Sequence, residues 1–268
     1  MCLIVLAHKL NSDYPLIMAA NRDEFRHRPT QNMHWWPNID ILAGKDLAAG
    51  GTWLALHKNG RWAAVTNFRQ TTNTKVTTNK VTANNLTAFK SRGQLAVNFL
   101  SQNKPAMDFV EELQMGQFAG FNLLLWDNHE LVFCSNEKQS QPQILAAGLY
   151  GLSNGRLNSD WPKVNHVKDV LQQSLHQPPQ HQQLQQMMQH TVIAADQRLP
   201  KTGIAMAWER RLSACFIDAP EYAYGTRTCI SLYRDSFGNM DVHETCFDHS
   251  TPLHQHFNWT NKSSCIPV

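Results

Sequence analysis

The sequence predicts an α+β fold in which a β-sandwich is flanked by helices. Strand pairs occur at both ends of the chain with helical segments between them, which is the order that such a sandwich requires. No G-x-G-x-x-G motif opens a helix after a strand, and no P-loop is present, so a Rossmann-type sheet is disfavoured. The 268 residues, of which 42% are hydrophobic and 17% charged, are sufficient for one large core, and we expect a single domain over residues 1–268.

Two hairpins are predicted in the first quarter of the chain. Cys2–Lys9 and Tyr14–Ala20 are apolar, β-prone runs separated by a short polar turn. Gly51–His57 and Arg61–Asn67 form the second pair, with Lys58-Asn59-Gly60 as the turn. Because the strands of a hairpin are antiparallel, the end of each second strand returns beside the start of its first.

The middle of the chain predicts two helices followed by a third hairpin. Ser91–Gln102 and Pro105–Gln114 have the three-and-four spacing of amphipathic helices, the second with Pro at its start. Phe121–Asp127 and Glu130–Ser135 then form a third hairpin across Asn128-His129. The polar stretch Thr71–Asn85, which precedes them, is expected to be an excursion from the sandwich or a lid over a cleft.

The last part of the chain returns from helix to strand. Asp160 is a plausible N-cap, and Pro162 fits the first turn of a helix. In order, the expected elements are a strand at Gln143–Leu149, a helix at Asp160–Leu175, a broken helical segment at Gln172–His190, strands at Leu212–Ile217, Arg227–Arg234 and Asn239–Phe247, and a C-terminal tail packed on the outside over residues 248–268.

Cys2 is the strongest candidate for chemistry. Removal of Met1 would make Cys2 the amino terminus, with a thiol and an α-amino group of pKa about 7.7–8.0 on one residue. That residue would then supply both the nucleophile and its general base. The alternative is that Cys2 is a small buried residue at the start of a strand.

Asn21-Arg22-Asp23-Glu24 follows the second strand, and the hairpin brings this polar run near Cys2. The Arg22 guanidinium would favour a thiolate, and Asp23 could orient the amine or the arginine. The alternative is a solvated turn with a surface ion pair.

Several motifs, in this order, together resemble the Transport and Golgi organisation protein 2 family, also called the NRDE family. They are Met1-Cys2-Leu3-Ile4, Asn21-Arg22-Asp23-Glu24, Gly50-Gly51-Thr52-Trp53-Leu54, Val65-Thr66-Asn67-Phe68-Arg69, Gly151-Leu152-Ser153-Asn154, Trp161-Pro162-Lys163-Val164 and Tyr224-Gly225-Thr226-Arg227-Thr228. The resemblance implies a four-layer αββα sandwich of the N-terminal-nucleophile (Ntn) hydrolase type, distantly similar to bile-salt hydrolases and penicillin V acylases. Members of the family have been linked to haem trafficking and to acyl-lipid metabolism.

The resemblance also implies roles for further residues. Asn67 and Asn154 match asparagines that line the nucleophile pocket of the related acylases, and they are the candidates for an oxyanion hole. Arg227 resembles a later arginine of those enzymes and would hold the thiolate or a substrate carboxylate. The candidates for substrate binding are Asn21, Trp53 and Arg69. The acidic motif departs from the acylases by one position, and one position along a strand exchanges the faces of the sheet.

Two functions from different classes follow. The first is an Ntn hydrolase with Cys2 as its nucleophile, acting on an amide or acyl thioester of a small hydrophobic metabolite, with no required cofactor. The second is a non-enzymatic carrier of haem or of an acyl lipid such as an acyl-CoA, which would use a tryptophan-rich apolar cleft. The tryptophans considered for that cleft are Trp35, Trp36, Trp53, Trp62 and Trp126, and Cys2 or some of the histidines would ligate the iron.

The composition argues against other classes of function. A net charge of +3 without a Lys/Arg run gives no support for nucleic-acid binding. The six cysteines form no C-x-x-C pair and, with the histidines, no zinc-like spacing, so we expect free thiols and no metal site. Neither a secretory signal nor an apolar stretch of about 18 residues is present, and we expect a cytoplasmic protein.

Overall fold

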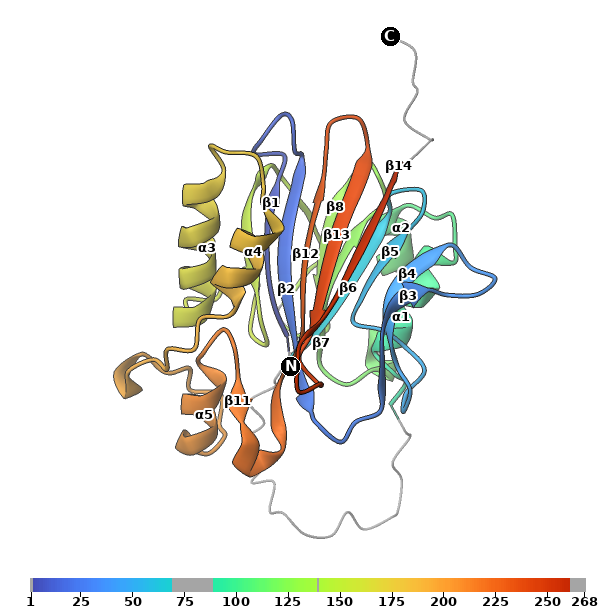
Figure 1. Ribbon diagram of the computed structural model, residues 1–268. Helices are drawn as coiled ribbons and strands as arrows, with labels where there is room; N and C mark the ends of the chain where they lie inside the picture. Colours follow the sequence, from blue (N-terminus) through green and yellow to red (C-terminus); the bar gives the residue numbers. More distant parts are fainter. Residues whose placement is uncertain (1, 69–88, 139, 261–268) are drawn as a thin grey trace.

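The computed structural model describes residues 2–68, 89–138 and 140–260, which form two antiparallel sheets with helices on their outer faces (Figure 1). In the first sheet the strand order is β10-β1-β2-β12-β13-β14, with β11 beside β12. In the second sheet the strands follow the chain, in the order β3-β4-β5-β6-β7-β8-β9. The fold is therefore of the mixed α+β class that the sequence predicts.

The bounds of the first sheet's strands are β1 Cys2–His8, β2 Leu16–Phe25, β10 Gly148–Leu152, β11 Asp218–Ala219, β12 Tyr224–Arg234, β13 Asn239–Cys246 and β14 Leu253–Thr260. Those of the second sheet are β3 Thr30–Trp35, β4 Ile41–Asp46, β5 Leu54–His57, β6 Trp62–Asn67, β7 Phe121–Trp126, β8 Leu131–Ser135 and β9 Gln143–Leu145. The α-helices are α1 Gly93–Leu100, α2 Ala106–Glu111, α3 Pro162–Ser174, α4 His181–Met188 and α5 Met206–Leu212. Within the described residues, no helix is both long enough and apolar enough to cross a bilayer.

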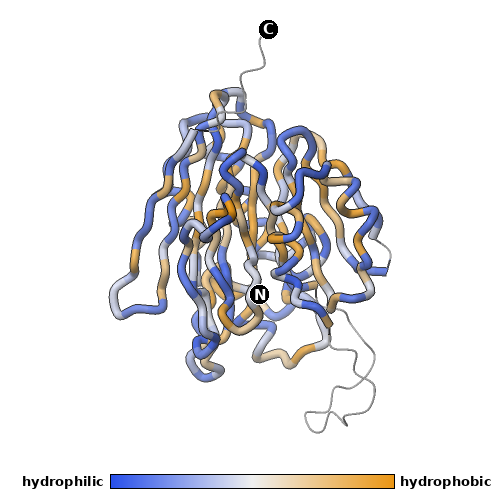
Figure 2. Tube along the Cα trace, turned by 90° about the vertical axis from the view of Figure 1, so that its right-hand side faces the viewer, coloured by the Kyte–Doolittle hydropathy of each residue, from blue (hydrophilic) through white to orange (hydrophobic). Residues whose placement is uncertain are grey.

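The strands place their side chains alternately on the two faces of each sheet, and this alternation creates three main apolar clusters. The first cluster fills the space between the sheets and includes Ile4, Met18, Trp62 and Leu232. The second packs α1 and α2 against the second sheet, and the third packs α3 and α4 against β1 and β2. Figure 2 shows hydrophobic positions recurring along the strands between hydrophilic ones, as this alternation requires.

The structure confirms the predicted hairpins. β1 pairs with β2, β5 with β6, β7 with β8, and β12 with β13, all antiparallel. In the first hairpin Cys2 lies opposite Arg22 and Leu3 lies opposite Asn21. The predicted proximity of Cys2 to the Asn21-Arg22-Asp23-Glu24 run is therefore correct, although β2 continues through that run to Phe25.

Several predicted elements are wrong. The expected single strand Gln143–Leu149 is two strands in different sheets, because the chain crosses between the sheets after β9. The expected strand Leu212–Ile217 begins at the end of α5 and continues as a buried segment without regular structure, since Cys215 and Ile217 pack under neighbouring helices and strands. Asp160 does not cap α3, whose first turn follows Trp161 and begins with Pro162.

The predicted C-terminal tail is also wrong over much of its length. Residues Leu253–Thr260 form β14, which pairs with β13 at the edge of the first sheet. Phe257 and Trp259 are partly buried against the core between the sheets, while Asn258 between them is exposed. The excursion or lid expected at Thr71–Asn85 lies outside the described residues.

Candidate functional site

A cleft of about 450 Å³ lies at the end of the sandwich where Cys2 begins β1. Both sheets contribute to it, together with the segment that leads into α1. The lining residues are Cys2, Arg22, Asp23, Glu24, Phe25, Arg28, Thr30, Gln31, Gly44, Lys45, Asp46, Ala49, Gly51, Thr52, Trp53, Val65, Asn67, Phe89, Lys90, Ser91, Arg92, Gly93, Ala119, Thr228 and Glu244.

Cys2 lies on the boundary between this cleft and the core between the sheets. Its side chain belongs to the apolar cluster between the sheets and is 6% exposed, yet it also lines the cleft. Its backbone oxygen accepts a hydrogen bond of 3.0 Å from the Ser153 hydroxyl. Burial raises the pKa of the Cys2 thiol to about 11, although the nearby Arg22 guanidinium lowers it in part. The thiol is therefore protonated at neutral pH.

Arg22 faces the cleft from the strand beside Cys2. Its Nη1 atom is buried and has no hydrogen-bond partner among the described residues. Within the described part of the chain, its Nη2 atom makes only two long ion pairs, at 3.8 Å to Glu24 and 4.0 Å to Asp46. A buried guanidinium group rarely leaves a donor unused, because the lost hydrogen bonding costs free energy. Arg22 therefore has a buried N–H without an acceptor among the described residues, beside the cleft.

Asp23 lines the same cleft and is fully buried. Its Oδ1 atom accepts a hydrogen bond of 2.7 Å from the Thr226 hydroxyl. Burial raises the pKa of Asp23, while the charges of Lys163 and Arg22 and the bond from Thr226 act in the opposite direction. The structure thus brings Cys2, Arg22 and Asp23 together, as the hairpin predicts.

Asn67 reaches the cleft from the second sheet, at the end of β6. Asn154 does not line this cleft; its Nδ2 atom donates to the backbone oxygen of Asn67 at 2.7 Å. Beside this contact, the Thr66 hydroxyl donates to the backbone oxygen of Ser153 at 2.7 Å. Asn154 and Ser153 therefore hold β6 of the second sheet beside the end of β10, and Asn154 positions Asn67 instead of facing the cleft.

Ser153 is the central residue of Gly151-Leu152-Ser153-Asn154-Gly155, which fits the G-x-S-x-G pattern of serine-hydrolase nucleophiles. That pattern indicates a nucleophile only where a strand turns directly into a helix. Here β10 ends at Leu152 and α3 begins only at Pro162. Ser153 is buried and its hydroxyl donates a hydrogen bond to the Cys2 backbone oxygen, so it is a structural residue.

Arg227 does not have the role that the sequence predicts. A β-bulge shifts the pairing of β12 with β2 between Thr226 and Thr228, so that Thr228 lines the cleft and Arg227 does not. The Arg227 guanidinium donates to Asp248, with Nε–O distances of 2.8 and 2.9 Å. Its Nη1 atom donates to Thr30 and to the backbone oxygens of Phe25 and Arg28. Arg227 is a buried ion-pair residue and does not hold the Cys2 thiol.

The predicted substrate-binding residues have three different outcomes. Trp53 lines the cleft. Asn21 is fully buried on the opposite face of β2, where Nδ2 donates to the backbone oxygens of Met188 and Cys215 at 2.8 and 2.9 Å, so its predicted contact with substrate is wrong. Arg69 lies outside the described residues.

The sequence also matches a family profile, described as Transport and Golgi organisation 2, over residues 1–249. The chain belongs to this family. A Transport and Golgi organization protein 2 homolog of Bos taurus is 28% identical over 261 residues, which cover 89% of each chain. The homolog of Homo sapiens is 32% identical over 168 residues, covering 59% of this chain and 56% of the human one. The Drosophila melanogaster protein is 25% identical over 276 residues, covering 97% and 95%.

Among solved structures, the fold is similar to a mutant C2A conjugated bile acid hydrolase from Clostridium perfringens. The TM-score is 0.44 at 9% sequence identity, and the superposition covers 97% of each chain.

In this member of the Transport and Golgi organisation 2 family, the cleft contains charged residues that sequence reasoning missed. Arg92 precedes α1, and its Nη1 atom donates to the backbone oxygen of Gly120 at 3.0 Å. Burial lowers the pKa of Arg92, and the neighbouring Cys2 and Glu24 raise it in part. Glu244 enters from β13, accepts a hydrogen bond of 2.8 Å from the Met33 amide, and has a pKa raised by burial to about 7. No motif marks either residue, because the fold alone brings them beside Cys2.

The carrier hypothesis expects the tryptophans to gather in one apolar cleft, and they do not. Trp62 and Trp126 are buried between the sheets, and Trp36 is buried in the cluster under α1 and α2. Trp35 is partly exposed, and its ring contacts the Trp259 ring edge to face. Of these tryptophans, only Trp53 lines the cleft, which is otherwise rich in charged and polar side chains.

A second and larger cleft, of about 530 Å³, lies near β9 and β10. Among its described lining residues, the charged ones are Glu137 and Arg156, and these two pair with each other at 2.9 Å. It offers neither a thiol nor an unpaired cation, so the cleft at Cys2 is the better candidate for a functional site in this family member.

Proposed function

We propose that this protein is an Ntn-hydrolase-like protein with Cys2 as its N-terminal nucleophile, acting on an amide or acyl thioester of a small hydrophobic metabolite. The proposal includes the finer architecture, a four-layer αββα sandwich of the Ntn type. The observation that carries it is the pairing of Cys2 with Arg22 at the cleft, where a thiol lies beside a buried guanidinium N–H that has no partner among the described residues.

The proposed reaction begins once removal of Met1 exposes the α-amino group of Cys2. This amine takes the thiol proton, and the thiolate attacks the acyl carbon of the substrate. The C–N or C–S bond of the substrate breaks, the leaving group takes the proton from the amine, and the acyl group remains on the Cys2 sulfur. Water then attacks this thioester, releases the carboxylic acid and restores the thiol. With a thiol pKa of about 11, the nucleophile forms only when a base is directly beside it.

The remaining parts of the site fit the charges that develop in such a reaction. The tetrahedral intermediate needs at least two N–H donors, and in this proposal the Asn67 amide and Arg22 Nη1 supply them. In this proposal Asp23 orients the α-amino group. Asn154 fixes the Asn67 backbone from behind.

The charges of the cleft favour a substrate that carries an anionic group. Five of the described lining residues are cationic and four are acidic; the cations are Arg22, Arg28, Lys45, Lys90 and Arg92, and the acids are Asp23, Glu24, Asp46 and Glu244. Because the pKa of Glu244 is near 7, part of its negative charge is absent at neutral pH. An acyl thioester with a phosphorylated carrier, or an amide with a terminal carboxylate, has the required chemistry.

Intact mass spectrometry of the purified protein, followed by labelling with a cysteine-directed acylating probe, tests the proposal. We expect complete loss of Met1, one acyl group per chain at neutral pH, and no labelling of Cys2→Ala. Cys134→Ala is the matched control, because Cys134 is buried in the second sheet away from the cleft and should leave labelling unchanged. Arg22→Gln should retain the fold and slow the labelling.

Retention of Met1, or labelling that survives Cys2→Ala, would overturn the hydrolase proposal. Haem titration of the same variants addresses the carrier alternative. A Soret shift that is equal in Cys2→Ala and in the unmodified chain, together with absent acylation, would favour a carrier that does not use this thiol.

A further inference from the structure

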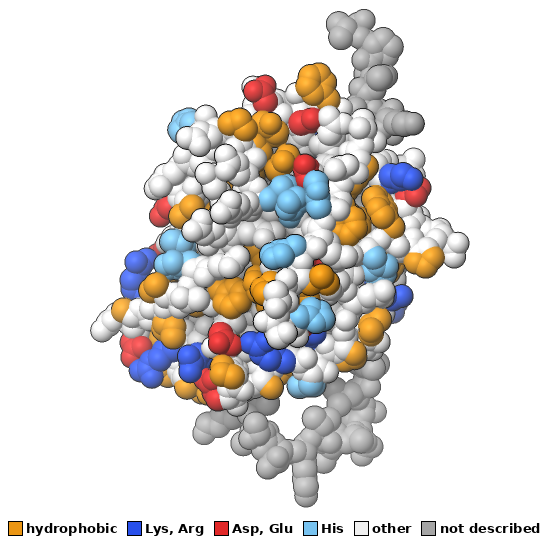
Figure 3. Space-filling model, in the orientation of Figure 1, with side chains coloured by type: hydrophobic (Ala, Val, Ile, Leu, Met, Phe, Trp, Pro, Cys, Tyr) orange, Lys and Arg blue, Asp and Glu red, His pale blue; other side chains and the backbone are white. Residues whose placement is uncertain are grey.

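Histidine side chains gather on the outer face of the first sheet, beside the start of α4 (Figure 3). Asp241 and His243 lie two residues apart on β13 and therefore on the same face, while Met240 and Val242 point into the core. β14 pairs with β13 so that His256 is directly opposite His243. His181 is the first residue of α4, which packs against β12. Three elements thus bring these four groups together, and we name them the histidine cluster.

The ligand atoms of the histidine cluster converge. Asp241 Oδ1 lies 3.0 Å from His181 Nε2 and 2.7 Å from His256 Nε2. One ligand atom each of His181, Asp241 and His243 lie within 4.8 Å of one another. The His181 and His243 rings are stacked at 3.7 Å between centroids, whereas the His181 and His256 rings are steeply inclined, at 63°.

We propose that the histidine cluster is a site for a divalent transition-metal cation such as Zn²⁺, with His181, Asp241 and His256 as ligands and His243 as the fourth. Zinc binds imidazole nitrogen and carboxylate oxygen at about 2.0–2.2 Å in a tetrahedron, which places neighbouring ligand atoms about 3.3 Å apart. The N–O distances of 3.0 and 2.7 Å are close to this value, so Asp241 can share the ion with either histidine after a small shift. The His256 ring must also move toward His181 and His243, because the group whose ligand atoms all lie within 4.8 Å of one another contains His181, Asp241 and His243 but not His256. The cation replaces the protons that these contacts otherwise share.

The residues around the cluster orient its ligands. His181 Nδ1 lies 2.8 Å from the Ser231 hydroxyl, so the nitrogen that does not face Asp241 has its own partner. The Tyr233 hydroxyl donates to Asp241 Oδ2 at 3.3 Å. Such hydrogen bonds to the far side of the ligands fix the tautomer and the direction of the rings in metal sites.

The cluster is also accessible. The side chains of His181, Asp241 and His256 are 12%, 29% and 47% exposed, which gives a cation a path from solvent. Its supports are rigid, because three of the four ligands stand on paired strands. The site lies on the outer face of the sheet, whereas Cys2 and Glu244 lie on the inner face, so this proposal does not depend on the proposed hydrolase.

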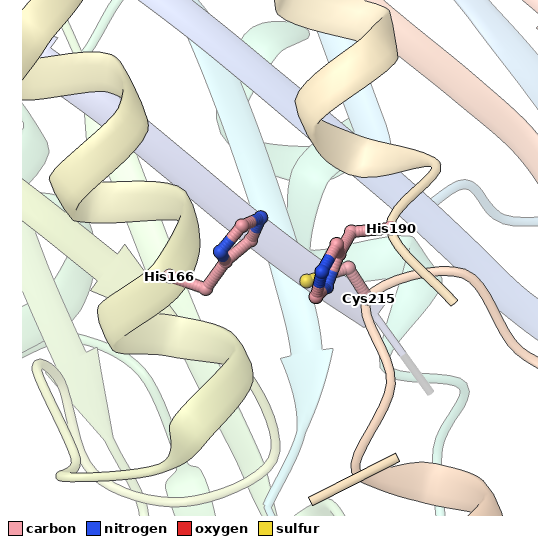
Figure 4. A group of neighbouring side chains, drawn as sticks. All are labelled: His166, His190 and Cys215. Carbon is pink, nitrogen blue, oxygen red and sulfur yellow. The ribbon is translucent and has the colours of Figure 1, made fainter. Parts of the chain in front are cut away.

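A second group of metal-binding residue types provides the internal control. His166 on α3, His190 after α4 and Cys215 before β11 converge as Figure 4 shows, and their ligand atoms also lie within 4.8 Å of one another. Cys215 is 1% exposed, and burial raises the pKa of its thiol to about 12, so it does not offer a thiolate at neutral pH. Among the described residues, this second group contains no carboxylate, whereas Asp241 joins the histidine cluster.

The experiment uses the full chain without an affinity tag, stripped of metal by a chelator and titrated with Zn²⁺ and Co²⁺. All variants also carry Cys2→Ala, so that the N-terminal thiol cannot bind the ion. We expect one equivalent of Zn²⁺ by calorimetry, and Co²⁺ ligand-field bands without a sulfur-to-cobalt charge-transfer band. His256→Gln and His181→Gln should weaken Zn²⁺ binding at least tenfold, Ser231→Ala should weaken it by about tenfold, and Cys215→Ser should have no effect.

His256→Gln changes a partly exposed residue on an edge strand, so its circular dichroism spectrum and its melting temperature without metal should match those of the parent chain. Absence of Zn²⁺ binding at submillimolar concentration would overturn the proposal. So would a charge-transfer band that disappears in Cys215→Ser, or one-equivalent binding that the cluster variants leave unchanged.

Discussion

Arg227→Met separates the structural role of this arginine from the catalytic role that its motif predicts. Arg227 is 6% exposed and forms a two-atom ion pair with Asp248, whose side chain is 23% exposed. It also donates to two backbone oxygens and the Thr30 hydroxyl, which join β12 to the segment after β2. Removing one partner of a fully buried pair costs roughly 3–5 kcal/mol. Because Asp248 keeps contact with solvent, the ion pair itself contributes less here, and the three lost hydrogen bonds of Nη1, at about 1 kcal/mol each, bring the expected loss into that range. We expect a loss of that size in the free energy of unfolding.

The loss should be visible in urea unfolding and as a decrease of about 6–20 °C in melting temperature, at about 2–4 °C per kcal/mol for a chain of this size. The double variant Arg227→Met/Asp248→Leu should recover part of the stability, because it leaves no charge unpaired but does not restore the hydrogen bonds to Phe25, Arg28 and Thr30. Acylation of Cys2, measured well below the melting temperature, should proceed at the parent rate. Unfolding free energy within 1 kcal/mol of the parent, combined with loss of acylation, would refute the reasoning and return Arg227 to the active site.

Three further outcomes are expected. The rate of Cys2 alkylation by iodoacetamide should rise about tenfold per pH unit from pH 8 to 9.5, because the thiol pKa is about 11, and a plateau below pH 9 would contradict this. Glu244 binds its proton more tightly in the folded protein than in the unfolded chain, because burial raises its pKa to about 7. The resulting stabilisation is fully present below pH 4.5 and is lost as pH rises through about 7, by roughly 3 kcal/mol in total. Glu244→Gln should remove this part of the pH dependence of the free energy of unfolding in urea. Gly51→Ala would place a Cβ 2.4 Å from the Gly93 carbonyl carbon and should destabilise the protein by about 1–3 kcal/mol, whereas a Cβ at Gly116 meets no atom within 4 Å and Gly116→Ala should be close to neutral in the same assay.

The sequence predicts the parts of the fold in which local patterns and nearby pairing are sufficient. The β1–β2 hairpin is an example, because its turn, its apolar strands and its antiparallel return lie within the first 25 residues. β14 was missed for the opposite reason. Its outer positions are His, Asn and Thr, and its inner Phe257 and Trp259 become core residues only when β13 lies beside them.

In the candidate site too, the sequence predicts contacts within a hairpin but not contacts between distant segments. Proximity of Cys2 to Arg22 follows from hairpin register, so it could be predicted. The role of Arg227 could not, because a one-residue bulge in β12 decides which side chain faces the cleft and because Asp248 lies 21 residues later in the chain. Arg92 and Glu244 come from separate elements and are brought to Cys2 only by the packing of the two sheets.

The position of Cys2 follows from how the space between the sheets is filled. Along β1, Ile4 and Leu6 face the second sheet and are fully buried in an apolar cluster. At Cys2 the facing groups change from apolar side chains to polar ones, because Asn67 and the charged residues of β2 and β4 cannot be enclosed in the core without partners. The cleft lies at that point, and the hydrogen bonds from Thr66 to Ser153 and from Asn154 to Asn67 join β6 to the segment after β10 beside it. The thiol thus has apolar packing on one side, which keeps it neutral, and a cleft lined by charged and polar side chains on the other.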